Sequence, residues 1–254
     1  MRIACWQAET PASGTRPGEQ LDRLAVAAAR AAEAGAALLI TPELYATGYP
    51  LSRRLLAEVD AGYTARVGRI AAGTGVTIVH GLPEVDGAAV YNVAAVVTPE
   101  RGTVASYRKA HLYGEHERAV FTAGDEPLVQ VEVDGVLVGL AICYDVEFPE
   151  VVRAHALAGT QLLAAPTALA GPWRFVPETL VAARAFESQL YLAYVNWAGG
   201  QYCGRSRLVD PHGQARAAGP EAEELLLAEV DLGELAAARA ETTYLTDRRP
   251  ELYR

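Results

Sequence analysis

The segment LVQVEVDGVLVGLAICYD, residues 128–145, is the part of the sequence that most strongly constrains the fold. Two apolar runs flank the dipeptide Asp134-Gly135, which favours the tight turn of a β-hairpin because both turn positions require positive φ. The second run leads directly into Cys143, so a cysteine stands where a predicted strand ends. The segment therefore predicts an antiparallel hairpin with a potentially reactive side chain at its end.

Two other predicted strands also end at a potentially reactive side chain. The apolar run 37–41 is followed at once by Pro42 and Glu43, and the predicted strand 103–108 is followed by Lys109. In open α/β sheets, ligands bind outside the carboxyl ends of the strands. We therefore treat the shared position of Glu43, Lys109 and Cys143 as the central observation about function.

Strands and helices alternate along the whole chain, which indicates the α/β class. Hairpins among the βα units imply mixed sheets, and two helix-covered sheets stacked as a sandwich account for the number of strands, with a closed barrel as the alternative. At 254 residues we expect a single domain, 1–254. Strands are expected at 2–8, 37–41, 76–82, 89–98, 103–108, 128–133, 136–143, 161–168, 189–198 and 224–232, and helices at 18–35, 52–72, 149–159, 177–188 and 233–240.

Composition and charge exclude several classes of function. A net charge of -9 and a pI near 5.1 argue against nucleic-acid binding, which needs concentrated Lys and Arg. No run approaches the roughly 18 apolar residues of a membrane span. Cys5, Cys143 and Cys203 form no disulfide framework and no metal-binding pattern, and MRIACWQ indicates a strand instead of a secretion signal. These features predict a cytoplasmic protein.

Each of the three strand-end residues has an ordinary interpretation when it is taken alone. A buried cysteine is usually inert, a lone lysine usually lies at the surface, and Pro-Glu often only opens a loop. Together they supply the parts of a thiol hydrolase. Glu43 would accept the thiol proton and later activate water, Cys143 would attack a carbonyl, and the Lys109 ammonium with the Tyr144 backbone N–H would stabilise the oxyanion.

The segments around these residues carry a resemblance that covers nearly the whole chain. They are PELYATGY (42–49), YRKAHLYGEHERAVFTAG (107–124) and CYDVEFPE (143–150), followed by AAPTALAG (164–171), ARAFESQLYLAYVN (183–196) and YLTDRRPEL (244–252). The set resembles the signature segments of the nitrilase-like carbon-nitrogen hydrolase superfamily, in the family's order. The resemblance implies a four-layer αββα sandwich, hydrolysis through a cysteine thioester without a cofactor, and a homodimer or higher homo-oligomer. It also implies a second glutamate, Glu117, that positions Lys109 and the substrate amide.

Further residues around the signature segments are candidates for contact with the substrate. Asp145 would bind either backbone amides or the substrate nitrogen. Glu147 stands where many relatives carry Arg, so it would meet a cationic substrate group or pair with Arg153. Tyr49, like Asn92, matches a family segment and would brace the pocket. The roles of three aromatic residues stay open between pocket and core: Trp173, Phe175 and Trp197.

The resemblance favours one reaction, the hydrolysis of a small primary amide, and leaves others open. True nitrilases carry Trp directly after the cysteine, whereas Tyr144 follows Cys143 here. The segments are most similar to bacterial aliphatic amidases, including enzymes of ω-amino amides such as 5-aminopentanamide, so an amine-bearing substrate is expected. The alternatives are an N-carbamoyl amino acid hydrolase, a nitrilase and a catalytically inactive binding protein. A papain-like Cys-His enzyme is less favoured, because His111 is better explained as a structural residue.

Overall fold

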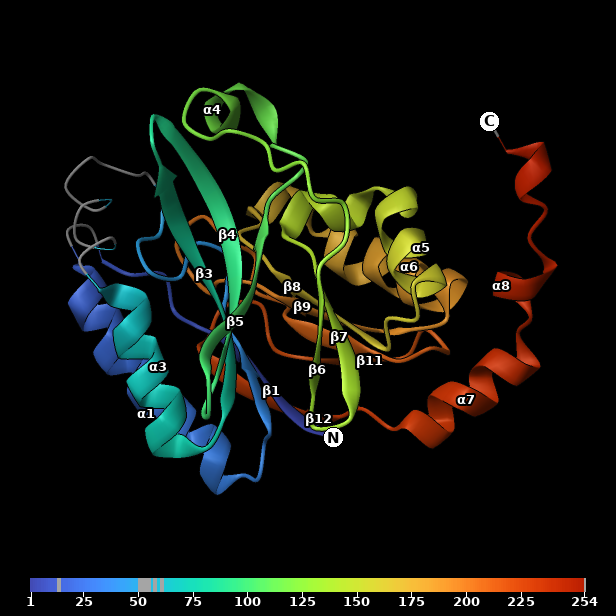
Figure 1. The fold of residues 1–254 in the computed structure, drawn as a ribbon, viewed down its shortest axis with the longest axis horizontal. Coiled ribbons are helices and arrows are strands. Elements are labelled where there is room, and N and C mark those ends of the chain that lie inside the picture. Colours follow the sequence, from blue (N-terminus) through green and yellow to red (C-terminus); the bar gives the residue numbers. More distant parts are fainter. Residues whose placement is uncertain (13–14, 50–55, 57–58, 60–61, 254) are drawn as a thin grey trace.

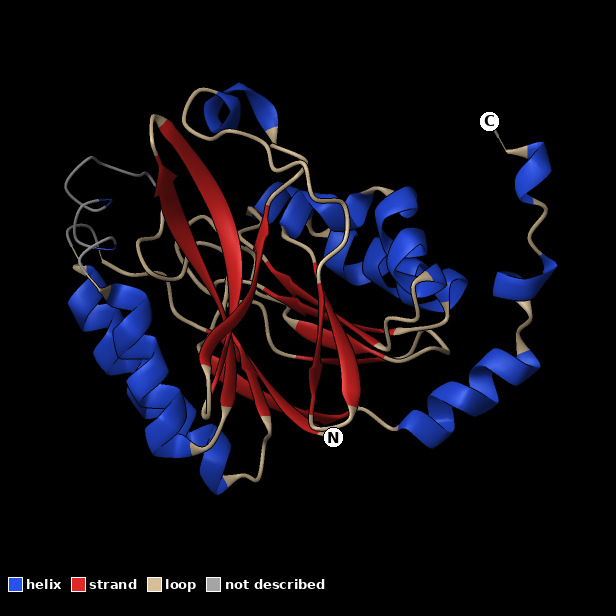
Figure 2. Cartoon of the chain, in the orientation of Figure 1, coloured by secondary structure: helices blue, strands red, loops and turns tan. Residues whose placement is uncertain are grey.

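The computed structural model describes residues 1–12, 15–49, 56, 59 and 62–253. Two six-stranded mixed sheets form its centre, and helices cover their outer faces (Figure 2). This arrangement confirms the expected four-layer αββα sandwich. The first sheet has the order β12 (Glu224–Glu229), β1 (Arg2–Gln7), β2 (Leu38–Ile40), β3 (Thr77–Asp86), β4 (Ala89–Thr98) and β5 (Gly102–Arg108). The second has the order β11 (Ala215–Ala217), β10 (Arg207–Val209), β9 (Tyr191–Val195), β8 (Leu162–Pro166), β7 (Val136–Leu140) and β6 (Gln130–Val133).

The two sheets have the same internal plan. Their three central strands are parallel, β1 with β2 and β3 in one sheet and β7 with β8 and β9 in the other. The outer strands are antiparallel and are joined by hairpins such as β6 and β7. At the turn of that hairpin Asp134 and Gly135 have φ of 48° and 75°, the positive values that the dipeptide was expected to adopt.

Helices lie on the outer face of each sheet (Figure 1). α1 (Pro17–Glu33) and α3 (Tyr63–Thr74) cover the first sheet, and α5 (Pro149–Leu157) and α6 (Val181–Ser188) cover the second. The short α4 (Gly114–Arg118) lies above one end of the sandwich, and α7 (Leu232–Glu241) and α8 (Tyr244–Asp247) lead towards the C-terminus. Short irregular helices complete the chain: η1 (Cys143–Glu147), η2 (Gly171–Trp173), η3 (Val176–Leu180) and η4 (Pro250–Leu252).

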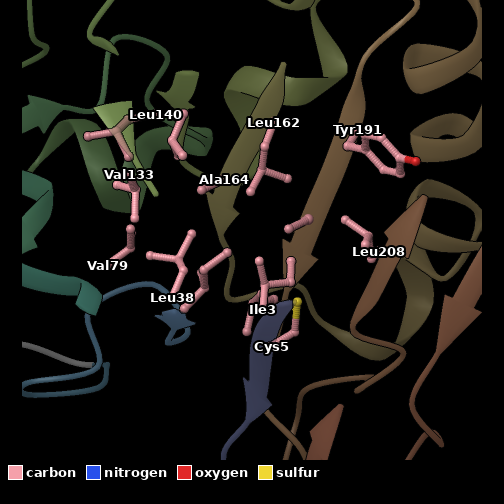
Figure 3. Close-up of a cluster of buried hydrophobic side chains, with 14 of the residues drawn as sticks. Ile3, Cys5, Leu38, Val79, Val133, Leu140, Leu162, Ala164, Tyr191 and Leu208 are labelled. Carbon is pink, nitrogen blue, oxygen red and sulfur yellow. The ribbon is translucent and has the colours of Figure 1, made fainter. Parts of the chain in front are cut away.

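Successive side chains of a strand point to opposite faces of the sheet, so a separate hydrophobic core lies on each face. In β1, Ile3 and Cys5 point between the sheets, while Ala4 and Trp6 point towards α1 and α3. The layer between the sheets is drawn in Figure 3, where Ile3 and Leu38 face Leu162 and Ala164. This apolar layer holds the carboxyl ends of the central strands of both sheets close to one another.

Several expected element boundaries differ from the structure, and the strands β10 and β11 were not expected. The expected helix 52–72 falls partly outside the described residues. Leu56 and Val59 are helical, and α3 begins at Tyr63 after Gly62, which adopts a left-handed conformation with φ of 90°. The strand expected to reach Cys143 ends at Leu140, and the backbone then turns into η1 at Cys143. No helix among the described residues combines the length and apolar character needed to cross a membrane.

Candidate active site

A cavity of about 490 Å³ opens at the end of the sandwich where β2, β5 and β7 finish. Glu43, Lys109 and Cys143 line it together, as their positions at strand ends suggested. Glu117 from α4 lines the same cavity. The remaining lining residues come from loops and short helices: Tyr49, Tyr113, His116, Tyr144, Glu147, Ala168, Leu169, Ala170, Trp173, Gln201 and Tyr202.

Cys143 is held in an unusual backbone conformation at the start of η1. Its φ is 47°, in the left-handed region that residues other than glycine rarely adopt. Such strain persists only where surrounding contacts impose it, and it is concentrated at functional sites. The sharp turn places a 7% exposed cysteine at the wall of the cavity directly after a buried strand.

Lys109 is the centre of a buried ion cluster. Its Nζ donates hydrogen bonds to Glu43 Oε1 at 2.7 Å and to both Glu117 carboxylate oxygens at 2.9 Å. Glu43 and Lys109 are each 1% exposed and Glu117 is 4% exposed. A buried charge is tolerated only when it is paired and hydrogen-bonded, and here one ammonium is shared by two carboxylates.

The backbone of the first sheet brings these charges together. The side-chain amide of Asn92 in β4 donates to Glu43 Oε1 at 2.7 Å, and the backbone N–H of Lys109 donates to the Asn92 carbonyl at 2.8 Å. Gly81 in β3 allows the loop after β2 to pass close by, since a Cβ there would lie 2.4 Å from the Leu44 nitrogen. Asn92 thus braces the site, the role expected from its sequence segment.

Glu43 is also fixed to the second sheet. Its backbone N–H donates to the Thr167 carbonyl at 3.2 Å, and the Trp197 indole N–H donates to the Glu43 carbonyl at 2.9 Å. Trp197 is fully buried and does not line the cavity, so its open role is resolved in favour of the core. This contact joins residues 154 positions apart, and no local sequence pattern could have indicated it.

Burial and charge shift the ionisation of the three central groups. Burial raises the pKa of Glu43, although the Lys109 ammonium lowers it. Burial and the neighbouring Glu43 raise the pKa of the Cys143 thiol well above its usual range, against the lowering effects of Lys109 and the Ala168 backbone. Burial opposes the charge of Lys109, but Glu43, Cys143 and Glu117 raise its pKa overall. The cluster therefore combines a protonated thiol, a carboxyl of raised basicity and a permanent ammonium.

Tyr49 and Tyr144 lie at the cavity, as expected for candidates in substrate binding. The Tyr49 hydroxyl is 2.7 Å from Glu117 Oε1 and 3.1 Å from Glu43 Oε1, so it bridges the two carboxylates that hold Lys109. The Tyr144 backbone N–H belongs to the first turn of η1, where donors have no partner within the helix. Tyr49 is placed to brace the cluster, and Tyr144 is placed to face a ligand.

Of the two roles left open for Asp145, its position favours binding to backbone amides over contact with the substrate nitrogen. Its fully buried carboxylate accepts hydrogen bonds from the Ile142 N–H at 2.9 Å, the His111 N–H at 2.9 Å and the Tyr107 hydroxyl at 3.0 Å. The His111 ring Nδ1 lies 2.8 Å away, and the hydrogen bond to Asp145 raises the pKa of His111. Asp145 does not line the cavity, and it joins the Cys143 turn to the loop after Lys109.

Glu147 lines the cavity but does not pair with Arg153. Instead, Arg184 donates to the Glu147 carbonyl at 2.9 Å and to the Val146 carbonyl at 3.2 Å, and it pairs with Glu187 at 2.8 Å. Burial raises the pKa of the Glu147 carboxyl, while Lys109 and Arg184 lower it. The Glu147 side chain has no cationic partner among the described residues.

The loops contribute residues that the sequence did not single out. Tyr113 and His116 follow the Lys109 strand, and Gln201 and Tyr202 come from the loop after β9. Trp173 lines the cavity, whereas the 63% exposed Phe175 does not. Within the described ranges, no group of three or more His, Cys, Asp or Glu side chains is arranged to hold a metal ion.

Comparison with known proteins places this geometry in a family. A "Hydrolase in pqqF 5'region" from Pseudomonas protegens is 38% identical over 263 residues, covering 100% of this chain and 90% of its own. An "(R)-stereoselective amidase" from a Pseudomonas species is 37% identical over 220 residues, covering 84% of this chain and 79% of its own.

Solved structures of an amidase from Nesterenkonia sp. AN1 have the same fold. One is 38% identical, has a TM-score of 0.88, and covers 100% of this chain and 98% of its own. Another, also 38% identical with a TM-score of 0.88, shows acrylamide added at the active-site cysteine of a variant, and covers 100% of this chain and 98% of its own. Residues 2–240 match the sequence profile named "Carbon-nitrogen hydrolase". The chain therefore belongs to the carbon-nitrogen hydrolase family.

Proposed function

We propose that this enzyme is an amidase that hydrolyses a small primary amide carrying an amine, releasing a carboxylate and ammonia. The observation that carries the proposal is the buried Lys109, held between Glu43 and Glu117 at the wall of the cavity that also contains Cys143. This set provides a nucleophile, a proton acceptor and a fixed positive charge.

The first half of the reaction forms a thioester. Because the pKa of the Cys143 thiol is raised, its sulfur attacks the amide carbon as its proton passes to Glu43. The C–S bond forms and the carbonyl π pair moves to oxygen, where the Lys109 ammonium and the Tyr144 N–H stabilise the charge. Glu43 then gives its proton to the nitrogen, the C–N bond breaks, and ammonia leaves.

The second half hydrolyses the thioester. Glu43 accepts a proton from water, whose oxygen attacks the thioester carbon, and the same oxyanion contacts apply. The C–S bond then breaks, the thiolate regains a proton, and the carboxylate product departs. Glu117 keeps Lys109 and Tyr49 in place during both halves, because its carboxylate contacts both.

The charge of the cavity supports an amine on the substrate. Glu43, Glu117 and Glu147 line it with Lys109 as the permanent cation, and the Glu147 carboxylate is free of an ion pair among the described residues. A cavity with excess negative charge attracts a cationic ligand. Glu115, in contrast, is exposed outside the lining, so the acidic contribution of α4 to the cavity comes from Glu117.

The test is ammonia release from a panel of 5-aminopentanamide, hexanamide, prolinamide, a dinitrile and an N-carbamoyl amino acid. We expect the amides to be cleaved, and we expect Cys143→Ala to abolish the activity. Cys5→Ala is the matched control, because Cys5 is a core thiol that does not line the cavity and whose pKa is raised by burial to about 12. Cleavage of the nitrile or the carbamoyl compound alone would overturn the amide assignment.

Two amides in the panel, 5-aminopentanamide and hexanamide, test the preference for an amine. Hexanamide has the length of 5-aminopentanamide but ends in a methyl group. We expect the cationic amide to have the higher kcat/KM, and Glu147→Gln to reduce the ratio of the two. Equal kcat/KM values in the wild type would contradict the amine, while leaving the amidase proposal standing.

We also propose that the enzyme works as a homodimer or higher homo-oligomer. Apolar side chains of α5, α6 and the C-terminal segment are exposed, among them Leu157, Phe186, Tyr244 and Leu252. Figure 1 shows the C-terminal segment projecting beyond the body of the sandwich on this side. Sedimentation velocity measures the mass in solution, and a monomer at all concentrations would exclude the proposal.

A further inference from the structure

Three aromatic side chains form a collar at the cavity, and we call Tyr113, Tyr144 and Trp173 the aromatic collar. The Tyr113 ring is perpendicular to both others, with centroid distances of 5.2 Å to Tyr144 at 74° and 6.4 Å to Trp173 at 78°. All three line the same cavity as Cys143. They come from three separate segments, since Tyr113 precedes α4, Tyr144 lies in η1 and Trp173 ends η2.

The collar marks the outer end of the cavity. Trp173 is 53% exposed and Tyr113 is 38% exposed, whereas Lys109 and Glu43 at the inner end are each 1% exposed. Exposed aromatic rings that line a binding cavity cost hydrophobic free energy while the cavity is empty, because their faces contact water. The rings are therefore placed to contact the part of a substrate that is remote from the scissile bond.

A carboxylate lines the same cavity as the collar. Glu147 lies three residues after Tyr144 in η1 and lines the same cavity. Its main-chain carbonyl is held by Arg184, but no described cation pairs with its carboxylate. Lys109, the lysine that lines the cavity, is paired with Glu43 and Glu117. The cavity thus combines aromatic side chains with a carboxylate that forms no ion pair among the described residues.

Aromatic faces and a carboxylate together recognise a particular cation. Ring faces attract cations through their quadrupole, and quaternary ammonium groups are the ligands that aromatic cages characteristically bind. A primary ammonium needs acceptors for three N–H groups to replace its water, whereas a methylated ammonium needs few or none and gains apolar contact with the rings. A neutral alkyl group would gain only the apolar contact.

We propose that the aromatic collar and Glu147 form a subsite for a methylated ammonium group at the far end of the amide substrate. The inference rests on the proposed amidase function and narrows its amine-bearing substrates to those with a tertiary or quaternary nitrogen. The subsite binds the cation, and the bond cleavage at Cys143 is unchanged. Cys143 and Glu147 are the first and last residues of η1 and line the same cavity, so one substrate can contact both if a short methylene chain joins its amide to its ammonium group.

The kinetic test compares two amides of the same shape. They are 4-(trimethylammonio)butanamide and 5,5-dimethylhexanamide, in which carbon replaces the charged nitrogen; 4-aminobutanamide adds the primary ammonium. We expect the trimethylammonium compound to have a kcat/KM at least tenfold above each of the other two. A ratio of one or less between the charged compound and its carbon isostere would overturn the subsite.

Variants assign the preference to the collar. We expect Trp173→Leu and Glu147→Gln each to lower the charged-to-neutral ratio several-fold, and Trp173→Phe to retain most of it. Phe175→Ala is the matched control, because Phe175 is a 63% exposed aromatic side chain two residues from Trp173 that does not line the cavity. The ratio cancels any loss of activity that is common to both substrates. If the charged-to-neutral ratio of kcat/KM is unchanged in both Trp173→Leu and Glu147→Gln, the proposal is contradicted.

A binding measurement separates this inference from the proposed function. Calorimetry with the Cys143→Ala variant would measure the affinity for tetramethylammonium, and quenching of tryptophan fluorescence would locate it, since Trp6 and Trp197 are buried and Trp173 is exposed. If the wild type hydrolyses no amide, the amidase proposal fails while binding still tests the subsite. If butanamide is hydrolysed but tetramethylammonium neither binds nor quenches, the subsite alone is wrong.

Discussion

The inner and outer ends of the cavity differ in how their polar groups are used. At the inner end every charge has a fixed partner: Lys109 bonds to Glu43 and Glu117, and Tyr49 bridges the same two carboxylates. At the outer end Glu147 and the aromatic collar have no such commitments among the described residues. The inner end is therefore preorganised, and our proposal assigns the selection of the substrate to the outer end.

Replacement of Lys109 by Met tests the inner end with the largest expected effect. Two buried carboxylates would lose their shared cation, so we expect a loss of stability of about 3–5 kcal/mol. The oxyanion would lose its charged donor, so kcat should fall by about 10³-fold. Chemical denaturation and ammonia release measure the two effects separately.

A second substitution separates stability from chemistry in that experiment. Glu117→Gln added to Lys109→Met removes one of the two facing carboxylates, so it should restore part of the stability without restoring kcat. Recovery of the activity in the double variant would show that Lys109 has a structural role only.

Replacement of Asp145 by Asn tests the connection between the Cys143 turn and the Lys109 loop. The amide group of Asn presents a donor where Asp145 accepts from Ile142 and His111, so we expect about a 10²-fold fall in kcat. KM for butanamide should change little, because Asp145 does not line the cavity. The exposed Asp125→Asn is the control, and a change in KM alone would contradict the positioning role.

Replacement of Tyr49 by Phe is a smaller change at the same end. It removes one hydroxyl from between Glu43 and Glu117 and leaves both Lys109 ion pairs in place. A single buried hydrogen bond to a charged group contributes about 1.5–3 kcal/mol. We expect kcat for butanamide to fall roughly tenfold, and an unchanged kcat would show that the hydroxyl only fills space.

The two ends should also respond to pH, with the smallest effect at the outer end. Glu43 must be ionised to accept a proton, and its raised pKa shifts the acid limb of kcat/KM to a pH above the value of about 4.3 for an exposed glutamate. The pKa of Glu147 is also raised, so protonation should remove the preference for cationic amides as the pH falls through that range. The pH dependence of kcat/KM for 5-aminopentanamide and for hexanamide separates the effects of Glu43 and Glu147. Parallel pH profiles for the two amides would exclude a role for the Glu147 charge.

The sequence predicted the fold and the inner end better than the outer end. Strand ends at 37–41, 103–108 and 136–143 indicated that Glu43, Lys109 and Cys143 belong together, and the three strands, β2 and β5 of one sheet and β7 of the other, end at the same cavity. The role of Glu117 was predicted from the family resemblance alone. The expected start of the helix 52–72 lies outside the described residues, and periodicity did not indicate the left-handed Gly62 that precedes α3.

The contacts that were missed all depend on tertiary structure. Trp197 holds the Glu43 carbonyl, and Arg184 holds the carbonyls after Cys143, in each case across a large sequence separation. Tyr113 and Trp173 meet only because their two loops fold over the cavity. The organisation as a single domain, the cytoplasmic location and the oligomeric state stay predictions.

The thioester on Cys143 is the central claim, and intact-mass spectrometry tests it directly. Glu43→Gln should acylate slowly and deacylate still more slowly, because it lacks the carboxylate that activates water. Mixed with butanamide, it should gain the mass of one butanoyl group, located on the peptide that contains Cys143, and Glu43→Gln/Cys143→Ala should gain none. Hydrolysis of butanamide by the Cys143→Ala variant at the wild-type rate, or an acyl group found on another residue, would contradict a thioester on Cys143.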